Sequence, residues 1–378
     1  MFGVYINSSF FSNLEAIYCY YAEYLEFGIL YTAMDYEYRT ESAFNKRYNL
    51  LTRKIVKLLS ENSRISVSEI AKRLLVSRPT VQDRISRLEK EFGMRYTIEL
   101  NERLLGLNSP HLIEIRFKKK PDFEKIRVFL SQSYIPQVAF STDGDYDMVI
   151  YANAFSTEEY VHWNMAMMVM LSEYEVMWHP SEVAHRHLGF FPLRNEAIEK
   201  ADIDENSKKL LMHLNNNSRL NFQQLSKAMG MHFNTVKYNF EKLMKAGYIK
   251  RPTITMNPVK GLSFMTLFDD YTPTKGFESS SARAREVIKF DEEHPLISRY
   301  LLSATLMGSH TLFILSAFDD KVSADRFGLA CHKSMYAKHG AKRLSGEIKE
   351  LILGRLPIRS VDIKKEYKTI MWTTEMNR

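Results

Sequence analysis

Cysteine is scarce in this sequence of 378 residues, which has only two, Cys19 and Cys331. Two cysteines so far apart offer neither zinc-ligand spacing nor a disulfide framework, as suits a reducing compartment. No uninterrupted apolar run of about 18 residues occurs, and the start lacks the basic and apolar segments of a signal peptide. We therefore expect a cytoplasmic protein that does not span a membrane.

Catalytic signatures are missing as well. The sequence has no Gly-rich phosphate loop and no nucleophile–base pair, so it predicts no catalytic residues and no cofactor. His179, His185 and His187 lie close together in the sequence, but no carboxylate or cysteine completes a ligand set around them. We interpret these histidines as part of a half-exposed edge strand and predict no metal site.

The charged residues are unevenly distributed. Hydrophobic residues make up 45% and charged residues 26% of the chain, as in ordinary globular proteins, and the length suggests two to four domains. The net charge is +7, but residues 53–103 hold 12 Lys/Arg against 7 Asp/Glu, and residues 204–260 hold 10 against 3. The rest of the chain is therefore net acidic. Two basic segments on a neutral scaffold indicate phosphate-binding surfaces.

The two basic segments are copies of each other. Residues 62–72 align with residues 217–227 at an offset of 155, and the register holds without a gap to Leu107 and Leu262. Identity is low, but the apolar positions coincide over these 46 residues, so we infer an internal duplication.

Each copy begins with three short helical patterns. In the first copy Ser66 or Ser68 is a candidate cap of the second helix, and Ser77 of the third. The third helix buries Val81, Ile85 and Leu88, and a β-like stretch over 95–100 suggests a wing. A plain helical bundle would show the same apolar spacing, but the polar, basic outer face of the third helix favours a winged helix-turn-helix.

A second pattern of strands and helices follows each copy. Residues 111–178 predict the order βαββαβ, with a hairpin turn at Asp143-Gly144-Asp145, which is typical of a ferredoxin-like sandwich. The second copy repeats it more loosely, with helices expected around 282–289 and 323–336. The predicted fold class is α+β, two tandem copies of a winged helix-turn-helix followed by a ferredoxin-like domain. The domains are 1–48 (an aromatic-rich extension), 49–107, 108–194, 195–207 (a linker), 208–262 and 263–378.

Three motifs resemble the Lrp/AsnC family of transcription regulators: Ile70-Ala-Lys-Arg-Leu, the third helix from Ser77 to Glu89, and Gly144-Asp-Tyr-Asp-Met-Val-Ile. The resemblance implies a winged helix-turn-helix before a ferredoxin-like ligand-sensing and oligomerisation domain. It also implies a small-molecule effector, such as an amino acid, near the glycine turn. By that analogy the effector-binding candidates are Gly144, Asp145 and Asp147.

The third helices would carry the DNA contacts, because such a helix fits the major groove of double-stranded DNA. The candidates in the first copy are Ser77, Arg78, Thr80, Gln82, Asp83, Arg84, Ser86 and Arg87. Those in the second copy are Asn234, Thr235, Lys237, Tyr238 and Lys242. The third helix of the second copy has few arginines, so we predict that the first copy reads bases and that the second copy anchors to phosphates. The two heads would act as an intramolecular pseudo-dimer or within a homodimer.

Two other classes of function stay open. Sirohaem decarboxylases are similar in fold to Lrp/AsnC proteins and work as paired subunits, so a tetrapyrrole enzyme is the first alternative. The second is an interaction module that binds the transcription machinery through its winged helices.

Overall fold

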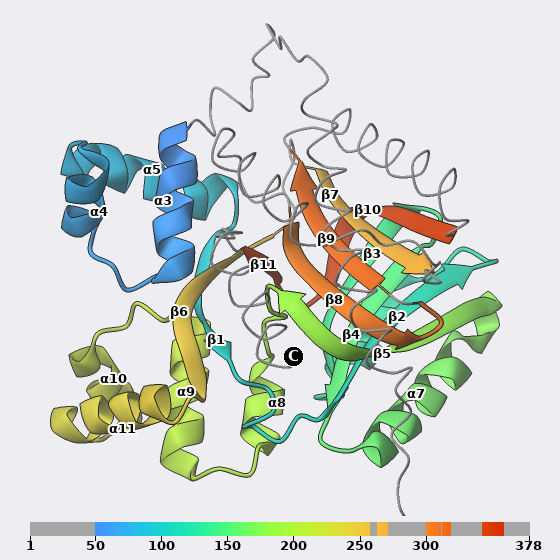
Figure 1. Cartoon of the computed structure of the whole chain (residues 1–378). Helices are drawn as coiled ribbons and strands as arrows, with labels where there is room; N and C mark the ends of the chain where they lie inside the picture. Colours follow the sequence, from blue (N-terminus) through green and yellow to red (C-terminus); the bar gives the residue numbers. More distant parts are fainter. Residues whose placement is uncertain (1–49, 258–262, 271–299, 311, 319–341, 359–378) are drawn as a thin grey trace, which may run out of the picture.

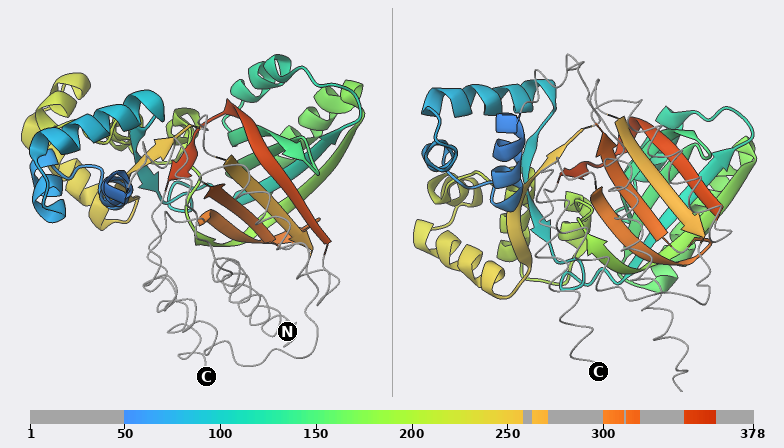
Figure 2. Two further views of the ribbon diagram at one scale, coloured as in Figure 1. Left: turned by 90° about the horizontal axis from the view of Figure 1, so that it is seen from above. Right: turned by 45° about the horizontal axis from the view of Figure 1, so that its top comes forward.

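The computed structural model describes residues 50–257, 263–270, 300–310, 312–318 and 342–358. The predicted extension over 1–48 and the helices expected at 282–289 and 323–336 lie outside these ranges. Two groups of helices stand on one side of a β-barrel (Figure 1), and two further views show the same separation (Figure 2). Within the described ranges, no helix is both long and apolar enough to cross a membrane.

The first group of helices, called unit 1, contains α3 (Leu50–Glu61), α4 (Val67–Leu74) and α5 (Arg78–Glu91). Local signals set these bounds. The Ser66 side chain accepts a hydrogen bond from the Glu69 amide at 3.1 Å, and Ser77 caps α5. Leu75, in the left-handed conformation, ends α4. Val81, Ile85 and Leu88 are buried on the inner face of α5, which confirms the predicted periodicity.

Unit 2 contains α9 (Glu205–Asn216), α10 (Phe222–Met229) and α11 (Phe233–Lys245). Asp204 caps α9, and Asn221 with Gln224 forms a capping box on α10. Gly230, with φ of 64°, ends α10 in the left-handed conformation that glycine adopts without strain. Units 1 and 2 therefore have the same order of three helices.

The stretch predicted as a wing does not form a hairpin of its own. It is β1 (Arg95–Leu100), which pairs antiparallel with β6 (Ile249–Met256), and β11 (Leu356–Ile358) adds to the other edge of β6. β1 is thus paired along one side with a strand about 150 residues later, and β6 is the central strand of this sheet. Within this pair Glu99 and Arg251 lie opposite each other and form an ion pair of 2.7 Å.

Eight strands form the closed barrel. The first four are β2 (Ser109–Phe117), β3 (Pro136–Gly144), β4 (Met148–Ala154) and β5 (Val176–Leu188). The others are β7 (Ser263–Asp270), β8 (Tyr300–Gly308), β9 (Leu312–Phe318) and β10 (Lys342–Leu353). The order around the barrel is β10-β3-β4-β2-β5-β8-β9-β7. In each set of four, the first strand lies between the third and the fourth. The β5–β8 and β3–β10 pairs join the two sets.

The first set of strands has apolar side chains on both faces. Tyr151 and Phe140 point into the barrel, where they pack with Phe268 and Phe313 of the second set. The other face packs on α6 (Phe123–Ser131) and α7 (Thr157–Leu171), which is followed by the short 3-10 helix η1 (Ser172–Tyr174). Figure 1 shows α7 outside the barrel wall. The element order over 109–188 is β2–α6–β3–β4–α7–β5.

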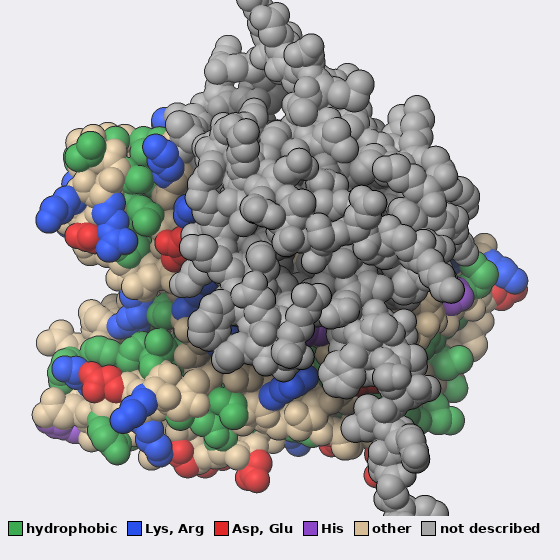
Figure 3. Space-filling view, viewed as in Figure 1, with side chains coloured by type: hydrophobic (Ala, Val, Ile, Leu, Met, Phe, Trp, Pro, Cys, Tyr) green, Lys and Arg blue, Asp and Glu red, His purple; other side chains and the backbone are tan. Residues whose placement is uncertain are grey.

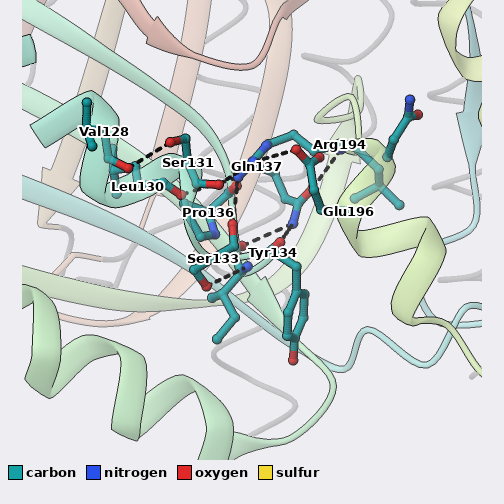
Figure 4. A network of polar contacts seen from close by, with 12 residues as sticks. Val128, Leu130, Ser131, Ser133, Tyr134, Pro136, Gln137, Arg194 and Glu196 are labelled. Atoms are coloured by element: carbon teal, nitrogen blue, oxygen red, sulfur yellow. Dashed lines mark hydrogen bonds and ion pairs between the residues drawn. The ribbon is translucent and has the colours of Figure 1, made fainter.

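The segment predicted as a linker begins with a packed helix, α8 (Asn195–Lys200), which buries Ala197 and Ile198 in the core of unit 2. Arg194, just before α8, donates hydrogen bonds to the carbonyl oxygens of Ser133 at 2.8 Å and Pro136 at 3.0 Å (Figure 4). The Arg194 amide donates to the Gln137 side chain at 2.9 Å. The segment predicted as a linker thus includes a helix, and its Ala197 and Ile198 belong to the core of unit 2.

A buried polar network joins the turn after β1 to the barrel. The Glu102 side chain is 6% exposed and forms an ion pair of 2.7 Å with Arg186 on β5. Its other oxygen accepts hydrogen bonds from the Asn153 amide at 2.6 Å and from the Tyr151 hydroxyl. Burial and the nearby carboxylate raise the pKa of Tyr151, so its hydroxyl stays protonated and donates to Glu102.

Replacing Glu102 should therefore destabilise the protein. Glu102→Ala leaves the Arg186 guanidinium without its carboxylate, which should lower the free energy of unfolding by about 3 kcal/mol. Glu173→Ala is the control, because it removes an exposed carboxylate paired with Lys125 and should cost less than about 1 kcal/mol. Denaturant unfolding measures both. Equal losses of unfolding free energy in the two variants would mean that the network does not hold the turn after β1 to the barrel.

Candidate nucleic-acid interface

The predicted contact residues of α5 lie along its outer face. Arg84 and Ser86 are half-buried, and the others are exposed, namely Ser77, Arg78, Thr80, Gln82, Asp83 and Arg87. They share one surface because Val81, Ile85 and Leu88 turn the opposite face into the core of unit 1.

These side chains differ in what they already contact. The Ser77 hydroxyl caps the helix and lies 2.8 Å from the Thr80 hydroxyl, while Asp83 and Arg87 form an exposed ion pair of 3.2 Å. Within the described part of the chain, Arg78 and Gln82 make no hydrogen bond or ion pair. The first turn of α5 therefore presents a cation and an amide to solvent, and Arg87 is held by its own helix.

Helix α11 presents its predicted residues in the same way. Asn234, Thr235, Lys237, Tyr238 and Lys242 are all exposed. The Tyr238 side chain is 66% exposed, and Lys237 lies 3.9 Å from Glu241. Lys and Arg side chains appear on both units in the space-filling view, and the outline is hollowed between the units (Figure 3).

Units 1 and 2 contact each other through residues that are equivalent in the repeat. The hydroxyls of Ser63 and Ser218 are 2.6 Å apart, and both serines are buried. The Arg64 guanidinium donates to the Ser218 carbonyl at 2.7 Å, and the Arg219 guanidinium donates to the Ile65 carbonyl at 2.9 Å. Each arginine thus reaches across to the other unit, although the two acceptor carbonyls, those of Ser218 and Ile65, are not equivalent in the repeat.

Aromatic rings complete this contact, which we call the Ser–Arg joint (Ser63, Arg64, Ser218 and Arg219). Arg64 lies 5.2 Å from the ring centroid of Phe222, and Arg219 lies 4.8 Å from that of Tyr96. Burial lowers the pKa of Arg64 below its usual value. In the sequence, Ser63-Arg64 and Ser218-Arg219 align the repeat, but no contact between the copies was predicted from them. The same Ser-Arg pair occurs at the same position in both copies, and this was the one signal in the sequence that could have indicated the contact.

The predicted effector-binding residues lie where the two sets of barrel strands meet. The Asp145 carboxylate accepts hydrogen bonds from the Ser345 amide at 2.7 Å and hydroxyl at 3.3 Å, while the Asp147 carboxylate accepts from the Phe117 amide at 2.7 Å. Gly144 has a φ of 147°, and a Cβ there would lie 2.4 Å from the Ser345 carbonyl oxygen. These contacts give all three residues a structural role, and effector binding stays a prediction.

A similar contact occurs at the opposite join, between β5 and β8. The Ser309 hydroxyl donates to the Pro180 carbonyl at 3.2 Å, and the His310 amide donates to the Ser181 hydroxyl at 3.0 Å. A Cβ on Gly308 would lie 2.9 Å from the Pro180 carbonyl oxygen. Each glycine turn therefore fits against the other set of strands.

His179 and His185 of β5 have different surroundings, and the side chain of His187 lies outside the described residues. Burial lowers the pKa of His185, and Arg103 and Arg186 lower it further. The His179 ring lies 6.2 Å from that of His310, whose Nε2 is 3.3 Å from the buried Glu114 carboxylate. Among the described residues, no group of three or more His, Cys, Asp or Glu is placed to hold a metal ion.

Comparison with known proteins gives two family matches. The model of the AsnC-type helix-turn-helix domain matches residues 51–89, and that of winged helix-turn-helix DNA-binding matches residues 203–250. The chain is 35% identical over 111 residues to an uncharacterized HTH-type transcriptional regulator of Pyrococcus furiosus, which covers 29% of this chain and 74% of that protein. It is 30% identical over 88 residues to the regulator LrpC of Bacillus subtilis, covering 23% and 58%.

Solved structures also resemble the chain. The siroheme decarboxylase NirDL aligns with a TM-score of 0.48 and 13% identity, covering 87% of this chain and 100% of that one. LrpC of Bacillus subtilis aligns with a TM-score of 0.28 and 22% identity, covering 35% and 92%.

The structural interpretation of Asp145 can be tested by its effect on stability. Asp145→Ala removes the acceptor of the Ser345 amide and should lower the free energy of unfolding by about 1 kcal/mol. Asp143→Ala, two residues away, removes only an exposed ion pair with Lys349 and should cost less than about 0.5 kcal/mol. Thermal unfolding compares the two variants. If Asp145→Ala is as stable as the wild type, the carboxylate is available for another role.

Proposed function

This chain belongs to the Lrp/AsnC family of helix-turn-helix transcription regulators, and from that premise we propose that its two helical units bind one double-stranded DNA site together. The observation that carries the proposal is the pair of exposed helix faces, α5 and α11, on units that contact each other through equivalent residues. In a helix-turn-helix dimer the second helix of each motif enters the major groove, and two motifs read two half-sites. Here a single chain supplies both motifs.

The same proposal interprets the whole fold as two tandem copies of a helix-turn-helix and a ferredoxin-like domain. The order β2–α6–β3–β4–α7–β5 supports it, as does the matching strand arrangement in the two sets of barrel strands. The copies would span 49–194 and 208–378, and the chain would be an intramolecular pseudo-dimer. Sedimentation of the free protein at the mass of one chain would agree with this, whereas a stable dimer would not.

The two helices would contribute differently to binding. Arg78 and Gln82 in α5 can form paired hydrogen bonds to guanine and adenine edges, and Arg87 can join them by leaving Asp83. In α11 the amines of Lys237 and Lys242 and the hydroxyl of Tyr238 suit phosphate contacts, which position a protein without reading sequence. The DNA site would therefore have one strongly and one weakly specified half.

Selection from random duplexes at two salt concentrations is the experiment that tests this function. A regulator of this kind should enrich a motif with two unequal halves, separated by about one helical turn or a multiple of it. Weak binding that falls steeply with salt and enriches no motif would contradict the proposal, because it would show only nonspecific phosphate attraction.

Paired substitutions would assign the roles of the two helices. Arg78→Ala/Arg87→Ala should abolish the preference for the selected motif, since each bidentate base contact contributes about 1–3 kcal/mol of discrimination. Lys237→Ala/Lys242→Ala should weaken binding to all duplexes and reduce the slope of log K against log salt by about 2. Electrophoretic or fluorescence titrations at several salt concentrations measure both effects.

The matched control removes two exposed lysines from the barrel, Lys118→Ala/Lys120→Ala, and should leave the motif preference unchanged. If the lysine pair of α11 carries the sequence preference and the arginine pair of α5 does not, the roles of the two helices are reversed.

A further inference from the structure

We propose that Arg64 and Arg219 fix the distance and orientation between the two DNA-binding units, so that the chain accepts its two half-sites at only one spacing. The proposal rests on the proposed function and deepens it. In this role the two arginines determine which DNA sites are bound without touching DNA. They are positioning residues.

The first support is the reciprocity of the contacts. Arg64 of unit 1 donates to the Ser218 carbonyl of unit 2, and Arg219 of unit 2 donates to the Ile65 carbonyl of unit 1. A planar guanidinium holds both distance and angle, since its donors are fixed in one plane and its face can stack on a ring. Arg64 is flanked by the rings of Phe222 and Phe240, so its direction is constrained on unit 2.

On the other side, Arg219 also donates to the Tyr96 hydroxyl at 3.1 Å, and that hydroxyl donates to Glu89 at 2.6 Å. Glu89 lies on α5, the predicted recognition helix of unit 1. A chain of hydrogen bonds thus runs from unit 2 through Tyr96 to the helix that would read the bases. Removing Arg219 would free one end of it.

The second support is the exchange of core residues between the units. Ile254 and Met256 of β6 lie in the core of unit 1, while Ile98 and Leu100 of β1 lie in the core of unit 2. A hinge motion between the units would have to expose these side chains to water. The paired strands keep the units together, and the Ser–Arg joint lies against the same strands. The Ser63 amide donates to the Pro252 carbonyl of β6 at 3.1 Å, and Arg219 contacts Tyr96 of β1, so the joint adds to what fixes the angle between the units.

A rigid pair of units and a flexibly tethered pair should respond differently when the spacing between the two half-sites changes. Each inserted base pair rotates a half-site by about 34° and moves it by about 3.4 Å along the duplex. Units on a flexible tether recover binding when a full turn of about 10 base pairs has been inserted, because the half-site faces them again. Units fixed at one distance do not recover binding after such an insertion, because the second half-site is then too far away.

The first test measures the joint without DNA. Spin labels at two exposed positions that are equivalent in the repeat, Lys72→Cys and Lys227→Cys, report the distance between the units, in a background with Cys19→Ser and Cys331→Ser. We expect one narrow distance distribution, and a clearly broader one in Arg64→Ala/Arg219→Ala. A broad distribution in the parent chain, or an equally narrow one in the variant, would overturn the proposal.

The second test measures affinity for the selected motif with 1 to 10 base pairs inserted between its halves. The wild type should lose at least tenfold at every insertion and should not recover at 10, whereas Arg64→Ala/Arg219→Ala should vary by less than about threefold across the series. Lys72→Ala/Lys227→Ala, which removes the same charge without breaking the joint, should keep the wild-type profile. An identical profile in the arginine variant would overturn the assignment.

A disulfide variant covers the case in which the arginine variant does not fold. The Ser63 and Ser218 hydroxyls are 2.6 Å apart, so Ser63→Cys/Ser218→Cys should oxidise readily in the same cysteine-free background. The locked chain should bind the selected motif within twofold of its reduced form. A loss of more than tenfold on oxidation would show that the units must separate to bind DNA. If no motif is selected, the proposed function fails, while the distance distribution still decides the joint.

Discussion

Unpaired strand edges are the constraint on which the rest of this structure depends. A sheet of four strands leaves the backbone groups of its two outer strands without partners. Here β5 pairs with β8 and β3 pairs with β10, so that the two sets of strands close one barrel without an edge. Outside the barrel, β1 also pairs with a distant strand, β6. Strand pairing between distant parts of one chain thus brings units 1 and 2 together.

Once these strands are paired, the positions of the functional residues follow. The β1–β6 pair sets the two units side by side, and the Ser–Arg joint adds a buried, reciprocal contact between them. Glu102 then ties the turn that follows β1 to β4 and β5 through Asn153 and Arg186.

Local chemistry could be predicted well from the sequence. Ser77 as the cap of α5, and Val81, Ile85 and Leu88 as its buried face, followed from spacing alone, and with them the exposed positions of Arg78 and Gln82. Other features of the structure depend on long-range contacts that the sequence pattern does not show. Residues 95–100 pair across the repeat rather than forming a wing, and the charged stretch after Arg194 contains α8, which packs on unit 2. The carboxylates of Asp145 and Asp147 accept hydrogen bonds from backbone amides, and effector binding by these residues stays a prediction.

The sequence by itself determined the family, the helices with their caps and the two basic segments, and it predicted a duplication at an offset of 155. The helices and their caps are encoded by residues within a few turns of one another, where periodicity and capping act. Only the tertiary structure decided which strand pairs with which, and that Arg64 and Arg219 each reach the opposite unit. Those contacts join residues about 150 positions apart, and no local preference records them, because their free energy arises from groups that meet only after the chain has folded.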